Sequence, residues 1–469
     1  MKNFSIKSLV VLPLSLGLFF TSCKRYSSDF GDTNVNPGAT TKPILSALLT
    51  NVEAGVGGYA ASTRNGLYCQ YFSETQYTDA SLYSLPQLDF EGRYSGALND
   101  LQNIINTNES NNMNQVARIL KAYIFSQTTD VWGDIPYSQA LTGNKTPAFD
   151  AQKAVYEGCI TELTQAVASF DALSGIKGDI IFAGDVTKWK KFANSLRMRL
   201  ALQLSKRYTA AGAYAAVQFN AALNDPAGYI TSNADNFAIT YPGGSFKNPW
   251  FSVYDGRKDY GESDQMVALL GSLSDSRQDV YGSSTLGVPY GRVRAYVDPW
   301  CQANPTWARI LKDANRPENG TVVMLSAAEV FLSRAEAADR GWTSENVSSL
   351  FQSGVNASFT QWGLAAPSAT YFTQAGTTLA AQGTGANVTA IAKQAYIAGY
   401  PDGTRGWNIW RRTGVPTLTP AVDAVNSTKQ IPRRYTFGQT SYGSNTAAVT
   451  AAVANMGGDT QDTKVWWDQ

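Results

Sequence analysis

The stretch Asp185-Val-Thr-Lys-Trp-Lys-Lys-Phe-Ala-Asn-Ser-Leu-Arg-Met-Arg-Leu-Ala-Leu-Gln-Leu204 has the clearest helical pattern in the chain. Its large apolar residues recur at steps of three or four, which places them on one face of an α-helix. They are Trp189, Phe192, Leu196, Leu200 and Leu204. Asp185 is suited to be the N-cap, and we expect the Lys and Arg side chains to fill the exposed face. The stretch predicts an amphipathic helix over residues 186–207.

Similar periodicity recurs outward from this helix in both directions. It predicts helices over residues 115–129, 152–170, 347–359 and about 386–399, and another that opens with Ser326 and Glu329 at capping-box spacing. Residues near 225–325 and 404–446 are rich in Gly, Pro, Asn and aromatics, so we expect long irregular loops there. The predicted helices come in pairs along the chain but show no fixed repeat period. Residues 43–469 are therefore predicted to form one large, mainly α domain.

The N-terminus has the layout of a bacterial secretory leader. A short basic start precedes an apolar run over residues 9–20, and two small residues then precede Cys23. We expect residues 1–22 to be a lipoprotein signal peptide and Cys23 to be lipidated, with residues 23–42 as a flexible tether. The alternative is an ordinary cleaved signal peptide followed by an incidental cysteine.

Composition excludes several kinds of function. The 38 Lys and Arg residues nearly balance the 37 Asp and Glu residues, so the chain lacks the basic excess of a nucleic-acid binder. Histidine is absent, which removes Ser-His-Asp and Cys-His catalysis and HExxH zinc sites. We predict no catalytic residue, no metal and no cofactor.

Cysteines are sparse in this chain. With Cys23 lipidated, Cys69, Cys159 and Cys301 remain, so at most one pair can form, and the sequence does not say which. No CxxC spacing exists to favour a zinc or redox site. The apolar core must therefore hold the fold.

Several segments after Cys23 resemble one known family. They are Phe30-Gly-Asp-Thr-Asn-Val-Asn-Pro37, Leu120 to Ala140 with Trp132-Gly-Asp-Ile-Pro-Tyr137 inside it, Gly178 to Leu200, Ala328 to Ala338, Arg411-Arg412-Thr413-Gly-Val-Pro416, Ile431-Pro-Arg433 and Val465-Trp466-Trp467. In this order they resemble the SusD/RagB family of nutrient-binding outer-membrane lipoproteins of the Bacteroidetes, and most closely its SusD-like branch. The resemblance covers essentially the whole mature chain.

The resemblance implies a fold and a role. The fold would be mainly helical, with tetratricopeptide-like helix pairs supporting a loop-rich, ligand-binding half. The protein would face the outside of the outer membrane on its lipid anchor. There it would capture a glycan or a peptide and deliver it to a SusC-like TonB-dependent barrel without chemistry of its own. Two alternatives stay open: a surface glycoside hydrolase that uses two carboxylates, and a structural lipoprotein without a small ligand.

Aromatic side chains in the irregular segments are the predicted ligand contacts. A sugar ring stacks its apolar face on such side chains, and polar neighbours bond its hydroxyls. The aromatic candidates are Tyr77, Tyr83, Trp250, Tyr254, Tyr290, Tyr296 and Trp300. The polar candidates are Asp79, Asn248, Asp255 and Arg292. Burial in the core is the alternative for each ring.

Other conspicuous residues are predicted to be structural. Trp132, Asp134, Trp189 and Asn194 belong to packed helices or turns. Arg411 and Arg412 are expected to pair with carboxylates or backbone carbonyls. The resemblance implies that Trp466 and Trp467 pack back on the body of the protein or help the contact with the partner.

Overall fold

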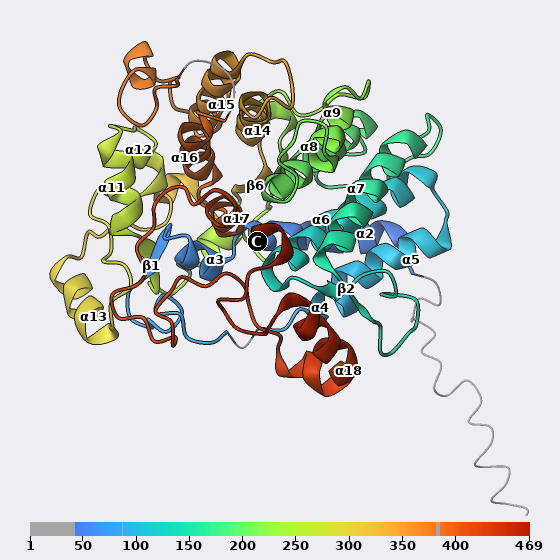
Figure 1. Cartoon of the computed structure of the whole chain (residues 1–469), viewed down its shortest axis with the longest axis horizontal. Coiled ribbons are helices and arrows are strands. Elements are labelled where there is room, and N and C mark those ends of the chain that lie inside the picture. The colour runs from blue at the N-terminus through green and yellow to red at the C-terminus, as the bar shows by residue number, and fades with distance from the viewer. Residues whose placement is uncertain (1–42, 87, 381–384) are drawn as a thin grey trace, which may run out of the picture. The chain divides into compact units, whose positions relative to one another are not determined.

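The computed structural model describes residues 43–469 apart from Gln87 and residues 381–384, so the predicted signal peptide, Cys23 and most of the tether lie outside the described residues. Helices dominate this part of the chain, which confirms the mainly α prediction (Figure 1). In chain order they are α2 Leu45–Ala60, α3 Thr63–Tyr68, α4 Glu91–Arg93, α5 Asn99–Thr107, α6 Asn111–Trp132, α7 Gln152–Ser169, α8 Val186–Gln203, α9 Tyr214–Leu223, α10 Pro249–Ser252, α11 Asp264–Ser272, α12 Gln278–Tyr281, α13 Arg294–Ala303, α14 Ala327–Asp339, α15 Val347–Gln361, α16 Val388–Gly399, α17 Gly403–Thr413 and α18 Gln439–Met456.

The long helices pack in consecutive pairs, in the tetratricopeptide-like manner that the resemblance implies. α6 lies against α7, α8 against α9, α14 against α15 and α16 against α17. Three small antiparallel sheets join the loops between them. They pair β1 (Phe72–Glu74) with β5 (Tyr260–Glu262), β2 (Ile135–Pro136) with β3 (Phe149–Asp150), and β4 (Phe237–Thr240) with β6 (Thr321–Leu325).

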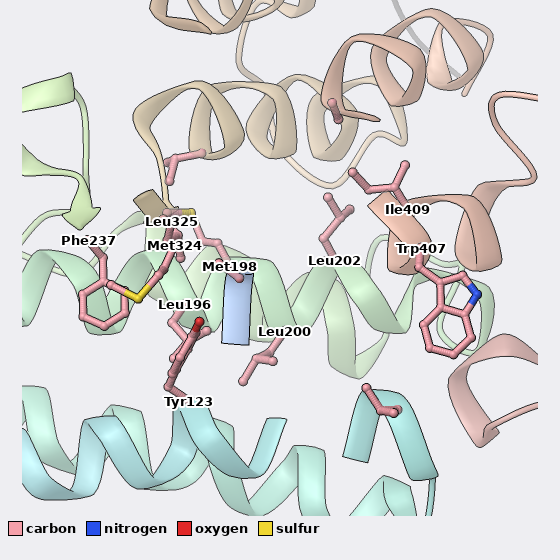
Figure 2. Close-up of a cluster of buried hydrophobic side chains, with 14 of the residues drawn as sticks. Tyr123, Leu196, Met198, Leu200, Leu202, Phe237, Met324, Leu325, Trp407 and Ile409 are labelled. Atoms are coloured by element: carbon pink, nitrogen blue, oxygen red, sulfur yellow. The ribbon is translucent and has the colours of Figure 1, made fainter. Parts of the chain in front are cut away.

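The predicted helix over residues 186–207 is α8, and it runs through the centre of the core. Asp185 caps it, because its Oδ1 accepts hydrogen bonds from the backbone N–H groups of Thr187 (2.8 Å) and Lys188 (3.1 Å). Figure 2 shows its side chains between those of other elements: Tyr123 of α6, Phe237 of β4, Met324 and Leu325 of β6, and Trp407 and Ile409 of α17. The five predicted apolar residues are all buried.

The expectation that Lys and Arg fill an exposed face of this helix is wrong for Arg197 and Arg199. Both are buried, because polar partners compensate their charges. Arg199 Nε lies 2.6 Å from an oxygen of Glu329 on α14. The Ser326 Oγ accepts the Glu329 N–H (3.2 Å), as the capping-box spacing predicts. The Glu329 carboxylate does not complete the capping box at the start of the helix, because it pairs with Arg199.

The expectation of an irregular stretch over residues 404–446 is wrong at both ends. α17 occupies residues 403–413 and α18 begins at Gln439, so only the part between them is irregular. Gly403 permits α17 because a Cβ there would lie 2.1 Å from the backbone N of Gly66. Residues 225–325, where long irregular loops are expected, contain short helices and strands joined by loops.

The residues predicted to be structural pack inside the protein, and Trp132 also lines a hollow described below. Trp132, Asp134, Trp189 and Asn194 are buried. Arg412 Nη2 contacts Glu336 Oε2 of α14 (2.7 Å), and Arg411 Nη1 donates to the Arg433 carbonyl (2.8 Å). The Trp467 indole donates to Asp130 of α6 (3.1 Å), so the C-terminus packs back on the body.

The described residues also show the state of three cysteines and the character of the helices. Cys69, Cys159 and Cys301 form no disulfide, so the pairing left open by the sequence does not occur among them. None of the helices described is both long and apolar enough to cross a bilayer.

Candidate functional site

The loop that follows β1 presents two of the predicted ligand contacts. β1 and β5 place Phe72 opposite Glu262 and Glu74 opposite Tyr260. The Thr75 N–H continues this pairing to the Asp259 carbonyl (2.9 Å). Just beyond, the Tyr77 side chain is 55% exposed, and Asp79 is exposed as well. A short sheet thus projects an aromatic ring and a carboxylate toward solvent.

A second pair of predicted contacts lies beside α13, which Figure 1 shows at one edge of the domain. The Arg294 guanidinium lies 5.5 Å from the centre of the Tyr77 ring, so α13 and the β1 loop meet. The Arg292 guanidinium lies 4.1 Å from the centre of the Tyr296 ring, which is 44% exposed. We call Tyr77, Asp79, Arg292, Arg294 and Tyr296 the Tyr77 surface.

Tyr77 lies between two hollows. One, of about 550 Å³, is lined by Tyr77 and Asp79 with Arg64, Leu88 and other side chains, and we call it the Tyr77 pocket. The other, of about 720 Å³, is lined by Tyr77 and Tyr254 with polar residues of the loop before β5. Both sizes suit a small ligand or a few sugar units.

Polar groups in the Tyr77 pocket offer both donors and acceptors. Arg64 Nη1 donates to the Tyr68 hydroxyl (3.2 Å) and to the Ser84 carbonyl (3.3 Å). Glu74 accepts the Ser81 N–H (2.8 Å), and burial raises the pKa of Glu74 to about 7. Such a lining can bond hydroxyl groups, which both donate and accept.

Four predicted contacts lie in the core and do not present free faces for stacking. Tyr83 and Tyr290 are buried with their hydroxyl oxygens 3.2 Å apart. Asn248 caps α10 by accepting the Trp250 N–H (3.0 Å), and both residues are buried. Trp250 lines a separate hollow of about 640 Å³ between β6 and α17. These residues support the loops that carry other candidates.

The remaining three predicted contacts, Tyr254, Asp255 and Trp300, lie within residues 225–325. The half-buried Tyr254 donates its hydroxyl to the Tyr260 carbonyl (2.9 Å) and lines the second hollow beside Tyr77. Asp255 is exposed and pairs with Lys247 (2.8 Å). Trp300 packs beside a small cluster of buried residues: Val288, Val297 and Trp307.

Sequence reasoning missed several residues of this site. Arg294 lies between Arg292 and Tyr296 in the sequence, so the recurrence of Arg or Tyr at every second residue was a usable signal. Arg64 and Glu74 gave no signal, because they stand on a six-residue helix and a three-residue strand. No group of three or more metal-ligating side chains gathers anywhere in the described ranges.

Comparison with known proteins places this chain in a family. Residues 34–438 match the SusD-like family model described as starch-binding and associating with the outer membrane. No curated protein matches the chain. A solved chitin-binding protein is 25% identical with a TM-score of 0.78, over 91% of this chain and 100% of its own.

Two further solved structures extend the likeness. A SusD homologue from Bacteroides uniformis is 26% identical with a TM-score of 0.75, over 91% of this chain and 99% of its own. A chitin-binding SusD homologue from Flavobacterium johnsoniae, 23% identical, has the same fold, with a TM-score of 0.79 over 91% of this chain and 98% of its own. Because the family model spans most of its length, the chain belongs to the SusD-like family of outer-membrane-associated proteins.

Proposed function

We propose that this protein is a non-catalytic nutrient-binding lipoprotein that captures a glycan at the Tyr77 surface. The observation that carries the proposal is the pair of exposed tyrosines, Tyr77 and Tyr296, each beside an arginine, with Tyr77 also lining two open hollows. The family description as starch-binding and the chitin-binding relative support a glycan as the ligand class.

The chemistry of the Tyr77 surface suits a carbohydrate. Each exposed tyrosine offers one flat apolar face for a sugar ring. Arg292 and Arg294 donate hydrogen bonds but do not accept them, whereas Asp79 accepts them. Sugar hydroxyls satisfy both kinds of group, so one oligosaccharide can bridge the tyrosines and the charged residues between them.

Isothermal titration with starch and chitin oligosaccharides tests this site. Tyr77→Ala and Tyr296→Ala should each weaken binding by roughly tenfold, since loss of one stacking ring costs about 1 kcal/mol or more. Phe246→Ala is the matched control, because Phe246 is an exposed aromatic (61%) on a different loop. Unchanged affinity in both tyrosine variants would refute the site. Binding of peptides but not glycans would replace the proposed ligand class.

Anchoring and delivery are the second part of the proposal. Cys23 would carry the lipid and residues 23–42 would form the tether, holding the protein at the outer face of the outer membrane beside a SusC-like TonB-dependent barrel. Cys23→Ser should release the protein from membranes but leave the glycan affinity of the released protein unchanged. Membrane fractionation and titration measure the two effects separately. A pull-down from outer-membrane extracts that recovers no TonB-dependent barrel would refute the partnership.

A further inference from the structure

Arg93, at the end of α4, is a cation without a matching anion. Its guanidinium carbon lies 4.8 Å from the centre of the Tyr59 ring and 5.2 Å from that of the Trp132 ring. Arg93 Nη1 donates to Thr128 Oγ1 (2.9 Å). Its other N–H groups have no acceptor among the described residues. The rings stabilise the faces of the guanidinium, while the hydrogen-bonding edge is mostly unused.

Ion pairing is the usual arrangement for buried arginines in this protein. Several contact a carboxylate directly: Arg277 with Asp275, Arg199 with Glu329, and Arg412 with Glu336. Arg93 is only half-buried, but it has no carboxylate within 4.0 Å among the described residues, and its partial desolvation lowers its pKa. The protein thus keeps a partly desolvated charge whose partner is missing.

Arg93 lines the Tyr77 pocket together with other unused donors. Gln127 lines the same pocket, and its side chain is 7% exposed and makes no hydrogen bond within the described chain. The Trp132 indole N–H is buried there without an acceptor in the described residues. The buried lining therefore holds these donors beside one buried carboxyl, that of Glu74, whereas the exposed lining includes the acidic Asp79 and Asp89.

We propose that the Tyr77 pocket binds a glycan that carries a carboxylate, with the carboxylate of an acidic sugar at Arg93. This inference rests on the proposed glycan-binding function and narrows its ligand class. A guanidinium binds a carboxylate through two parallel hydrogen bonds, which Arg93 has free to give. Asp79 and Asp89 on the exposed lining would repel a polyanion. The expected ligand holds a single carboxylate among neutral sugars.

Titration with a matched pair of oligosaccharides tests the inference. The probe is xylotriose that bears one glucuronic acid, and its partner is the same compound after reduction of the carboxylate to an alcohol. The acidic form should bind at least about tenfold more tightly, because charge-assisted hydrogen bonds are roughly twice as strong as neutral ones. This preference should shrink as salt is added. Equal affinity for the two forms, or tighter binding of a sulfated xylotriose, would overturn the carboxylate assignment.

Arg93→Gln locates the effect. This variant should bind the acidic and the reduced forms with equal affinity, and a circular dichroism spectrum like that of wild type shows that it is folded. A retained preference would overturn the role of Arg93. Binding of neutral glycans through Tyr77 without any acid preference would refute this inference alone. Failure of acidic and neutral glycans alike would refute the proposed function as well.

Discussion

Glu336 of α14 provides a strong test of how the helix pairs hold together. Its carboxylate contacts Arg412 of α17 and Arg340 of its own helix, and it is almost completely buried. Burial alone would raise the pKa of Glu336, but the charges of Arg412 and Arg340 outweigh burial and lower it from 4.5 to about 2. At about 1.36 kcal/mol per pKa unit, this shift corresponds to about 3 kcal/mol of stability at neutral pH.

Glu336→Gln removes this charge with little change of shape. We expect the variant to lose about 3 kcal/mol of unfolding free energy at pH 7, as measured by urea denaturation. Since the folded pKa is depressed, the contribution is complete above pH 4.5 and declines as the pH falls toward 2. At pH 3 the difference from wild type should fall to less than half of its value at pH 7, about 1 kcal/mol.

Glu162→Gln is the matched control for this prediction. Glu162 pairs with Arg118 at 2.7 Å, but its side chain is 41% exposed. Exposed pairs contribute about 0–1 kcal/mol, so this variant should stay close to wild type. The reasoning is refuted if Glu336→Gln loses no more than the control, or loses as much at pH 3 as at pH 7.

Three further outcomes follow from the structure. Burial raises the pKa of Glu262 from 4.5 to about 8, so wild-type stability should fall between these pH values. Urea denaturation should show that the unfolding free energy of Glu262→Gln rises by roughly 3–4 kcal/mol relative to that of wild type over this pH range. A difference between variant and wild type that does not change with pH would contradict this. Gly403→Ala should lower the unfolding free energy by about 1–3 kcal/mol, because its Cβ would meet the Gly66 backbone. Gly55→Ala should raise it by about 0.5–1 kcal/mol, because a Cβ there meets open space in α2. Thermal unfolding measures both changes. Incubation of the protein with glycans should release no new reducing ends. Glycan cleavage that disappears when a carboxylate of the pocket is mutated would indicate a hydrolase.

The regular helices could be predicted from the sequence because their apolar spacing is strong and local. α8 begins where Asp185 predicts it, and its apolar stripe is buried. α17 could not be predicted, because Gly403 and Gly406 are poor helix formers. Tertiary contacts override that propensity: these glycines let the helix approach the Gly66 backbone and the Tyr71 ring.

The site could be predicted only in part, because burial of a ring depends on contacts distant in sequence. Tyr77 and Tyr83 stand six residues apart in one loop, yet the first is exposed and the second buried. The Tyr83 hydroxyl accepts the N–H of Ala421, 338 residues away. Arg93 was missed for the same reason: its significance comes from the carboxylate that is absent around it, which no local pattern shows.

The buried tyrosines nevertheless contribute to the site by fixing its loops. Tyr290 donates its hydroxyl to the Leu67 carbonyl (2.7 Å) and faces Tyr83, so α3, the β1 loop and the segment before α13 are joined. The Asp423 N–H donates to the Gly291 carbonyl (3.0 Å), and its carboxylate pairs with Arg292. The loop after β1, the segment before α13 and the segment around Asp423 are therefore joined to one another near Tyr77 and Tyr296. If a glycan stacks on these tyrosines, as we propose, the ordering of their loops is already complete on folding and takes nothing from the affinity.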